Sequence, residues 1–316
     1  MTSISIVIPV KDDPPIFDAV ASVLGQADEI VVVDNGSAPR FRARLESLSP
    51  GVRVVDEPVR GPAAARNRGI AESTGDVVFF LDADCVAAPD WAAEGLRALE
   101  EARADIVGGR SRAMPATRQA RFVVKTWTVT PERIASRVLV YADTKNLAVR
   151  RHVFERVRFD ERLPRYEDHQ FGFEAEAAGF TMIRCPEMTI EFAPDERLAL
   201  HAAKMMGTGW ARAFTVAEGR RKPRRGRRGR RPLGAARELG FYVLRRPAVV
   251  RAFARATLIG ARAVDVAAPV LPTTAGGWFA RRAASFGRTA GMAMHAAGYA
   301  APSTSDLLGG RFPARR

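Results

Sequence analysis

Residues Asp76–Cys85 read DVVFFLDADC, and this stretch decides the fold. Val77–Leu81 are five consecutive apolar residues, a run typical of a strand that is buried on both faces. The run ends at Asp82 and Asp84, two acids separated by a single alanine. A buried strand is a rigid element, so it holds both carboxylates at one edge of a sheet. The stretch therefore predicts a strand and, at its end, a candidate site.

Similar apolar runs rich in β-branched residues occur on both sides of this stretch: Ile4–Val10, Ile30–Val33, Val52–Val55 and Ile106–Val107. Amphipathic stretches separate them. In the first, Ile16, Val20, Val23 and Leu24 fall on one helical face behind Pro14 and Pro15, which favour a helix start. This alternation predicts an α/β fold, in which helices flank a mostly parallel sheet.

Polar residues follow three of the predicted strands directly. Lys11–Asp13 follow the first strand, Asp34–Ser37 follow the second, and Asp82–Asp84 follow the fourth. Parallel strands end at the same edge of a sheet, and the loops there part around a crevice where ligands bind. We therefore expect the three clusters to converge on one crevice.

The second half of the chain reads less clearly. A strand-like segment, Lys145–Arg151, precedes predicted helices near His152–Val157, Glu167–Ala178 and Asp195–Glu218. The pattern weakens between Arg110 and Tyr141, which we assign only as a region of loop and helix.

Composition indicates a folded protein with a basic surface. Hydrophobic residues make up 47% of the 316, and the formal charge is +14, which suits a polyanionic partner. The only cysteines, Cys85 and Cys185, form no CxxC motif and predict neither a disulfide framework nor a zinc site. The N-terminus resembles a first strand rather than a signal peptide, and no uncharged apolar stretch is long enough to span a bilayer. These features favour the cytoplasm.

Gly219–Arg231 reads GRRKPRRGRRGRR, with nine basic residues in thirteen and no acid. Such a tract acts as a solvated linker, as a nucleic-acid arm or as a tether to anionic lipid headgroups. A predicted helix follows it, with Arg251, Arg255 and Arg262 on one face. That arrangement favours peripheral contact with an anionic membrane surface, on the inner face of the cell membrane, over nucleic acid.

Four segments resemble the family 2 glycosyltransferases, in the order and approximate spacing of that family: Ser3–Asp13, Val31–Ser37, Gly61–Cys85 and Phe159–Glu174. The resemblance covers about Ile4 to Gly219. It implies a GT-A fold, a Rossmann-like sheet flanked by helices. It also implies an inverting glycosyltransferase that moves a sugar from a nucleotide diphosphate, a UDP-sugar above all, to an acceptor hydroxyl in cell-surface or lipid-linked glycan synthesis.

The resemblance also implies roles for donor-binding residues. Pro9, Val10 and Asp12 would line the nucleotide pocket. Asp34 would accept a hydrogen bond from the base, and Arg66 would bind near the base or the diphosphate. Each has a structural alternative: Asp34 suits a turn with Asn35 and Gly36, and Arg66 suits an exposed helix position.

Glycosyl transfer from such a donor leaves negative charge on the departing oxygen, and a divalent cation neutralises it. Aspartate oxygens suit Mg²⁺ or Mn²⁺, which also bind substrate phosphates. We assign Asp84 as the direct ligand, with Asp82 reaching the donor ribose or a metal-bound water. The alternative is that both acids merely cap the next helix.

Glu167 and Asp168 resemble the acidic pair that supplies the catalytic base in this family. Inverting displacement needs a carboxylate that takes the proton of the attacking hydroxyl. Asp168 is the predicted base, and Glu167 is predicted to orient the acceptor. Two acids at a helix N-terminus are also what the helix dipole favours, so a structural role is the alternative.

One departure from the family concerns the metal. Many relatives carry a further metal-binding histidine about two dozen residues beyond the acidic pair, whereas Thr189–Glu196 contains none. His201, the nearest histidine, lies in a predicted helix where packing is the better explanation. The metal would then rest on Asp84, phosphates and water, or on Glu191.

These predictions divide the chain into a GT-A domain over residues 1–218, an Arg-rich linker over 219–231 and a helical region over 232–316. The nucleotide-sugar half of the domain would span about 1–110, and the acceptor half about 111–218. Two other functions remain open: a non-catalytic nucleotide-sugar-binding protein on the same fold, and a nucleic-acid-binding protein that uses the Arg-rich tract.

Overall fold

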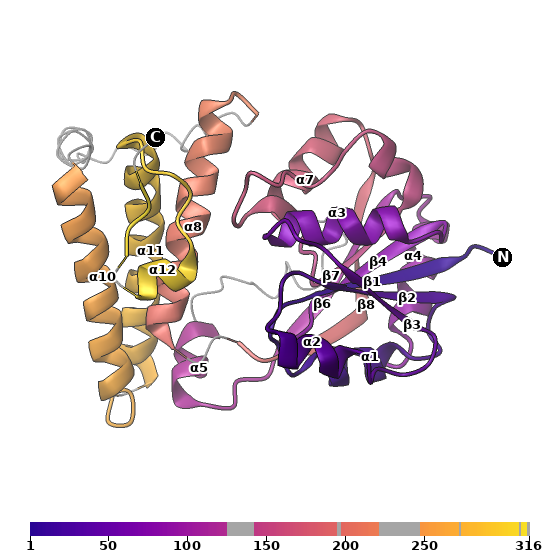
Figure 1. Ribbon diagram of the computed structural model, residues 1–316, viewed down its shortest axis with the longest axis horizontal. Coiled ribbons are helices and arrows are strands. Elements are labelled where there is room, and N and C mark those ends of the chain that lie inside the picture. Colours follow the sequence, from indigo (N-terminus) through magenta and orange to yellow (C-terminus); the bar gives the residue numbers. More distant parts are fainter. Residues whose placement is uncertain (125–141, 195–196, 221–246, 272, 310, 315–316) are drawn as a thin grey trace. The chain divides into compact units, whose positions relative to one another are not determined.

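The computed structural model describes the whole chain except residues 125–141, 195–196, 221–246, 272, 310 and 315–316 (Figure 1). It divides into two compact units. Unit 1 comprises Met1–Met114, Val129–Arg162 and Glu167–Ala193, and unit 2 comprises Pro115–Thr128, Leu163–Tyr166 and Pro194–Arg316.

Unit 1 is built on one sheet with the strand order β3-β2-β1-β4-β7-β6-β8-β5. Strands β1 to β4 run parallel, as do β6 and β8, whereas β7 and β5 run antiparallel to their neighbours. The predicted mostly parallel α/β fold is therefore confirmed. The strands are β1 (Ile4–Val10), β2 (Glu29–Asp34), β3 (Val52–Asp56), β4 (Val77–Leu81), β5 (Cys85–Ala87), β6 (Ile106–Ala113), β7 (Asn146–Arg150) and β8 (Met182–Phe192).

Helices cover both faces of this sheet. One core, which includes Ile6, Ile8 and Phe79, packs against α1 (Ile16–Val23), α2 (Pro39–Leu45) and α4 (Trp91–Glu101). The opposite core, which includes Val7 and Phe80, packs against α3 (Pro62–Glu72), the 3₁₀ helix η1 (Arg151–Glu155) and α7 (Glu167–Ala177). Burial on both faces explains why the central strands read as continuous apolar runs.

Helix α3 lies directly on β1. A Cβ atom added at Gly69 would overlap the side chain of Val7, so only glycine permits this approach. The close contact sets the height of α3 above the sheet and with it the position of Arg66, one turn earlier in the helix.

The sequence predicted the strands β1, β2, β3, β4 and β7 to within about one residue, but it missed β8. Strand β8 carries Pro186 together with charged residues, which masks its apolar alternation. Its register with β6 shifts there, so that Cys185–Met188 lie opposite the single residue Gly109. The shift accommodates a proline that has no backbone N–H to donate.

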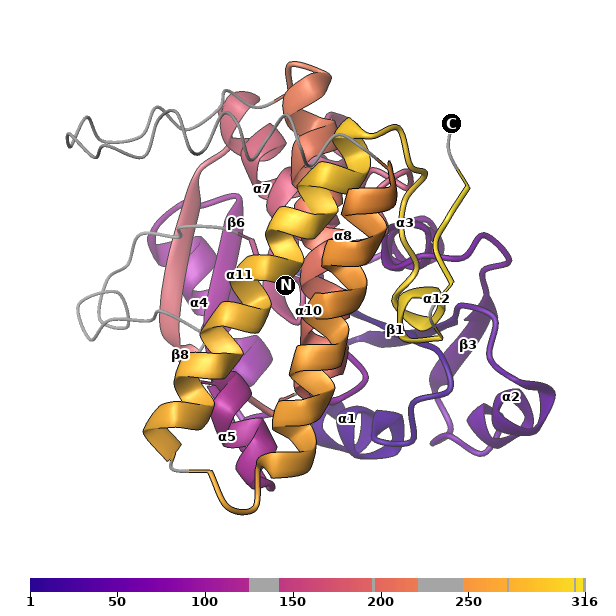
Figure 2. The ribbon, with the colours of Figure 1, turned by 90° about the vertical axis from the view of Figure 1, so that its left-hand side faces the viewer.

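Unit 2 is helical. Among its described residues it contains α5 (Arg118–Val124), α8 (Leu198–Ala217), α10 (Pro247–Ala267), α11 (Thr273–Ala296) and α12 (Thr304–Leu308). Helices α8, α10 and α11 lie side by side (Figures 1 and 2). Glycines allow the backbones of α8 and α11 to touch: a Cβ at Gly209 would overlap the carbonyl of Arg288, and one at Gly291 would overlap that of Met206.

This division differs from the one drawn from the sequence. Sequence analysis ended the first domain at residue 218, whereas α8 belongs to unit 2. The reason is that α8 buries Met206 and Trp210 among helices, and the Trp210 indole donates to the carbonyl of Tyr299 at 3.0 Å. The predicted Arg-rich linker lies almost wholly outside the described residues. None of the described helices is both long and apolar enough to cross a bilayer.

Candidate active site

The loops after β1 and β2 are tied together at the carboxyl edge of the sheet. Pro9 pairs with Val33 and Val10 with Asp34, so the two strands end at the same level. Asp12 has a left-handed backbone with a φ of 49°; its N–H donates to Ser37 Oγ at 2.9 Å, and its Oδ1 accepts from Ala38 N at 2.8 Å. The side chain of Val10 belongs to the hydrophobic core, so only its backbone is open to polar contacts.

Asp34 and Asn35 organise the next loops. Asp34 is buried, accepts from Ser37 N at 3.0 Å and lies 3.7 Å from Arg42 Nε. Asn35 donates to the carbonyls of Glu57 and Val59 and accepts from Gly61 N at 2.8 Å. Sequence analysis treated Asn35 only as a turn former, but it links the end of β2 to the start of α3.

Asp82–Cys85 form a tight turn between β4 and β5. The Cys85 N–H donates to the Asp82 carbonyl at 3.1 Å, Ala83 is buried, and Asp84 is exposed. Burial raises the pKa of the Cys85 thiol, and the carboxylates of Asp82 and Asp84 raise it further. The thiol is therefore protonated, donates to Asp84 Oδ1 at 3.3 Å, and has no nucleophilic character.

Arg66 is a buried residue of α3, not an exposed one, and it joins the two acidic motifs. Its Nη2 lies 2.8 Å from Asp82 Oδ1 and its Nη1 lies 2.6 Å from Glu167 Oε1. Burial lowers the pKa of Arg66, but Asp82, Glu167 and Asp168 together raise it above its usual value. One cation thus connects residues of β4, α3 and α7 that are far apart in the sequence.

Glu167 and Asp168 begin α7, as predicted. The Glu167 side chain is buried in its pair with Arg66, whereas Asp168 is partly exposed and lies 2.9 Å from His169 Nδ1. Burial raises the pKa of Asp168, but His169 and Arg66 more than offset this and hold it well below its usual value. Asp168 is therefore ionised at neutral pH. Sequence analysis did not assign a role to His169.

Lys145 is a second cation that sequence analysis did not single out. Strand β7 pairs antiparallel with β4, with Asn146 opposite Leu81, so Lys145 comes level with the turn that holds Asp82. It pairs with Asp143, stacks 5.2 Å from the Phe192 ring, and its charge lowers the pKa of Cys85 against the stronger raising effects. Only the strand register reveals this position.

The hard oxygen ligands that Mg²⁺ or Mn²⁺ needs are present, but they are few. Asp84 is exposed, whereas Asp82 is held by Arg66 and Glu191 lies 3.3 Å from Arg112. His201 is buried in α8. Within the described part of the chain no three acidic, histidine or cysteine side chains form a metal-binding cluster. This set fits a cation bound through one or two carboxylates and completed by substrate phosphates and water.

Comparison with known proteins identifies a related family and several relatives. Residues 5–158 match the family model described as Glycosyl transferase family 2. Glycosyltransferase AglE of Haloferax volcanii is 30% identical over 202 residues, which are 60% of this chain and 62% of that protein. Succinoglycan biosynthesis protein ExoO of Rhizobium meliloti is 30% identical over 183 residues, 52% of each chain.

This chain thus covers less than two thirds of the length of either relative. Among solved structures, S. aureus TarS 1-349 in complex with UDP-GlcNAc aligns with a TM-score of 0.49 at 16% identity, covering 66% of this chain and 65% of that one. A likeness of that size carries no functional argument.

Proposed function

Because this chain belongs to glycosyl transferase family 2 through its residues 5–158, we propose that it transfers a sugar, with inversion, from a nucleotide diphosphate donor to an acceptor hydroxyl. The observation that carries the proposal is the Arg66 bridge between Asp82 and Glu167. It brings the acidic turn at the end of β4 and the acidic start of α7 to one cation, so a donor diphosphate and a proton acceptor have a common site.

Asp168 is the proposed base. It is ionised and partly exposed, and it takes the proton of the acceptor hydroxyl as that oxygen attacks the anomeric carbon. His169 is a positioning residue that holds one carboxylate oxygen. The buried Glu167 is proposed to orient the acceptor. It does so together with Arg66, whose guanidinium donates to the Glu167 carboxylate.

The leaving nucleoside diphosphate needs positive charge, and Arg66 and Lys145 supply it from the protein. Asp84, supported by Asp82, would hold Mg²⁺ or Mn²⁺, which would supply the remaining neutralisation. Asp12 and Asp34, with the backbone of Pro9 and Val10, form the proposed nucleoside end of the donor site, where their loops are already cross-linked.

The donor is proposed to be a UDP-sugar and the acceptor a glycan or lipid-linked glycan. The relative ExoO is named as a succinoglycan biosynthesis protein, and we infer a glycan acceptor for this chain by analogy. Lipid-linked acceptors are met at a membrane surface, so we also propose peripheral contact with an anionic membrane, on its cytoplasmic side.

A binding screen tests the donor site directly. We expect one nucleotide sugar of a panel, with Mn²⁺ present, to raise the melting temperature of the protein, since a ligand that binds the native state stabilises it. Asp84→Ala should weaken donor binding about tenfold or more in Mn²⁺, equivalent to about 1.4 kcal/mol, and have little effect in EDTA. Equal donor binding by Asp84→Ala and by the natural protein in Mn²⁺ would remove Asp84 from the metal site.

Turnover separates this function from the main alternative. A non-catalytic nucleotide-sugar-binding protein is the alternative that the missing metal-binding histidine beyond the acidic pair suggests. It predicts donor binding without hydrolysis or transfer to any acceptor. Slow donor hydrolysis in Mn²⁺ that Asp168→Asn abolishes would instead identify an enzyme.

A further inference from the structure

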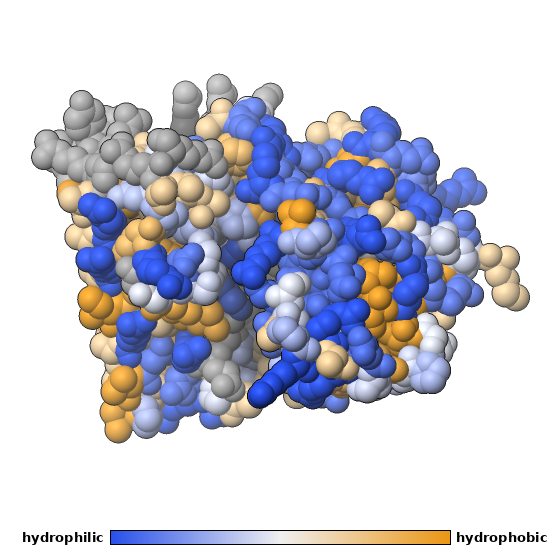
Figure 3. All heavy atoms as spheres, viewed as in Figure 1, coloured by the Kyte–Doolittle hydropathy of each residue, from blue (hydrophilic) through white to orange (hydrophobic). Residues whose placement is uncertain are grey.

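More than half of the exposed large apolar side chains among the described residues lie on one helical hairpin. Among the described residues they include six from α10, α11 and the turn between them, and all three of the exposed aromatic rings belong to this group: Ile259, Val266, Val270, Trp278, Phe279 and Phe286. Figure 2 shows α10 and α11 lying side by side, and Figure 3 shows hydrophobic patches on the side of unit 2 where α10 lies, with hydrophilic residues between them. Isolated exposed apolar residues are ordinary, but a concentration of this kind marks a contact surface.

On α10 these residues lie opposite the buried face. Ile259 and Val266 are seven residues apart, which places them within about 20° of one another around the helix, and Val270 follows in the turn after α10. Val250, Ala254 and Leu258 face the core of unit 2 instead. The outermost line of α10 is therefore apolar, although it faces solvent.

On α11 the exposed side chains pair aromatic rings with arginines. Trp278 and Phe279 lie edge to face at 5.0 Å, and the guanidinium of Arg282 lies 5.2 Å from the Trp278 ring. Phe286 contacts Phe253 of α10 edge to face at 5.9 Å, so the two helices are in apolar contact there. We call this surface, Ile259, Val266, Val270, Trp278, Phe279 and Phe286, the hairpin face.

The charges around the hairpin face have one sign. Arg251, Arg255 and Arg262 of α10 and Arg281 and Arg282 of α11 are exposed. Arg255 and Arg262 also touch the C-terminal segment, at the ring of Phe312 and the carbonyl of Leu308. The one acid between residues 247 and 296 is Asp265, whose carboxylate accepts from the backbone N–H groups of Leu198 and Ala199 at the start of α8.

We propose that the hairpin face docks on the headgroup region of an anionic phospholipid bilayer, with its apolar side chains inserted and its arginines at the lipid phosphates. Trp and Arg side by side match the amphipathic layer between water and hydrocarbon, where an aromatic ring and a cation are both favoured. A second copy of the chain is a poorer partner, because a two-fold interface would press the same arginines against each other.

This docking deepens the proposed function, since it assigns the membrane contact to defined residues. It rests on the proposed function only in that the membrane contact serves to bring a lipid-linked acceptor to the enzyme. The two are separable by experiment: vesicle binding needs the hairpin face, whereas donor binding needs Asp84 and its neighbours.

Vesicle flotation of the full chain tests the proposal. We expect the protein to float with vesicles of phosphatidylcholine and phosphatidylglycerol and to stay behind with phosphatidylcholine alone. Trp278→Ser combined with Phe279→Ser should weaken partitioning about tenfold or more. Arg281→Ser combined with Arg282→Ser should weaken it by about fivefold for each arginine and reduce its sensitivity to salt.

The matched control is Leu24→Ser combined with Val59→Ser, two exposed apolar residues of unit 1, which should float like the natural protein. Circular dichroism melting of every variant excludes unfolding as the cause of a loss. Asp84→Ala should float normally even if donor binding fails, which separates the two proposals.

Two results would overturn the docking. One is flotation that Trp278→Ser with Phe279→Ser leaves unchanged. The other is a dimer in solution, seen by light scattering, that dissociates in the same variant while no flotation occurs; the hairpin face would then bind a second copy.

Discussion

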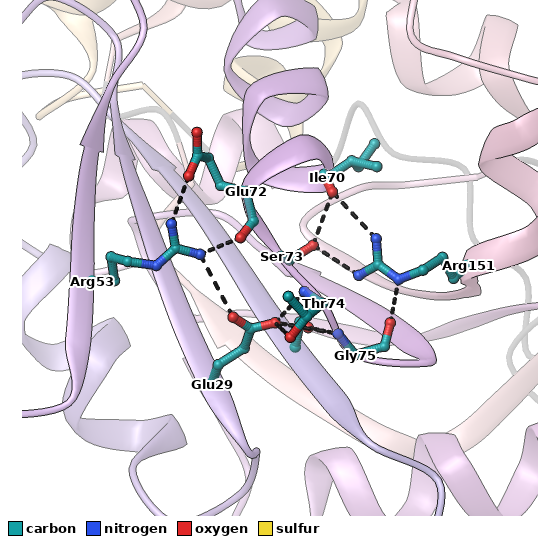
Figure 4. Close-up of polar contacts among 9 residues, drawn as sticks. Glu29, Arg53, Ile70, Glu72, Ser73, Thr74, Gly75 and Arg151 are labelled. Carbon is teal, nitrogen blue, oxygen red and sulfur yellow. Dashed lines mark hydrogen bonds and ion pairs between the residues drawn. The ribbon is translucent and has the colours of Figure 1, made fainter.

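The two edges of the unit 1 sheet both collect charged residues, yet they use them differently. At the amino edge, Arg151 and Glu29 bind backbone around the turn before β4. Arg151 donates to the carbonyls of Ile70 and Gly75 and to Ser73 Oγ, while Glu29 accepts from the N–H groups of Thr74 and Gly75 (Figure 4). Arg53 closes the group by pairing with Glu72 and Glu29.

At the carboxyl edge, the acids around Arg66 bind a charged side chain. Arg66 pairs with both Asp82 and Glu167, with Asp168 near enough to affect its pKa. A surplus of carboxylates around one buried cation adds repulsion that a protein selected only for stability would avoid. The difference is that the amino edge ties down the turn before β4, whereas the carboxyl edge groups carboxylates around one cation, as the proposed metal site and base require.

Each edge also carries an Asp–His pair, and the largest predicted effect separates them. Asp168→Asn should lower the rate of transfer about 10²- to 10⁴-fold, because the amide cannot take a proton, and leave donor affinity unchanged. The matched control is Asp105→Asn at the amino edge, where His152 Nε2 lies 3.0 Å from Asp105 Oδ1. Steady-state transfer assays check both variants. Equal loss in the two would end the distinction between the edges.

The next effect concerns stability. Arg66→Met removes a buried cation and leaves two carboxylates without it, which should cost about 3–5 kcal/mol in the free energy of unfolding. Arg53→Met breaks the pairs of an arginine that is 43% exposed, and should cost about 0–1 kcal/mol. Urea denaturation measures both. If Arg53→Met proved the more damaging, the amino edge would be the electrostatic centre of the sheet.

A smaller effect probes the amino edge alone. A Cβ at Gly75 would lie 2.7 Å from the backbone nitrogen of Ser5, so Gly75→Ala should cost about 1–3 kcal/mol in the free energy of unfolding. Donor affinity should not change. Gly260→Ala is the control, because no atom lies within 4 Å of the added carbon and α10 should gain slightly. Loss of donor binding in folded Gly75→Ala would show that the two edges are coupled.

The smallest effect is a pH dependence. Burial lowers the pKa of His169, but Asp168 raises this pKa by more, so the folded-state pKa lies above the ordinary value. Protonated His169 therefore stabilises the fold at acidic pH, and this contribution disappears as the pH rises through the raised pKa. As the pH rises from about 6 through the raised pKa, the natural protein should lose more stability than His169→Gln does. Parallel pH profiles of the melting temperature of the two proteins would refute the pairing.

Much of unit 1 could be predicted because its signals are local. The apolar runs of β1 and β4 and the acids that follow them are consecutive in the chain, and so are Glu167 and Asp168 at the start of α7. Strand β8 was not predicted because Pro186 and its charged neighbours interrupt the alternation of apolar and polar residues on which a strand prediction depends.

Sequence by itself determined which segments become buried strands and which acids end them, because hydrophobic periodicity acts within a few residues. Only the tertiary structure decided that Arg66 joins Glu167 across 101 positions, that Lys145 comes level with Asp82, and that α8 packs in the helical unit. The physical reason is that an ion pair, a strand register and a helix interface each depend on both partners. The local sequence of one partner does not specify which segment the other will be.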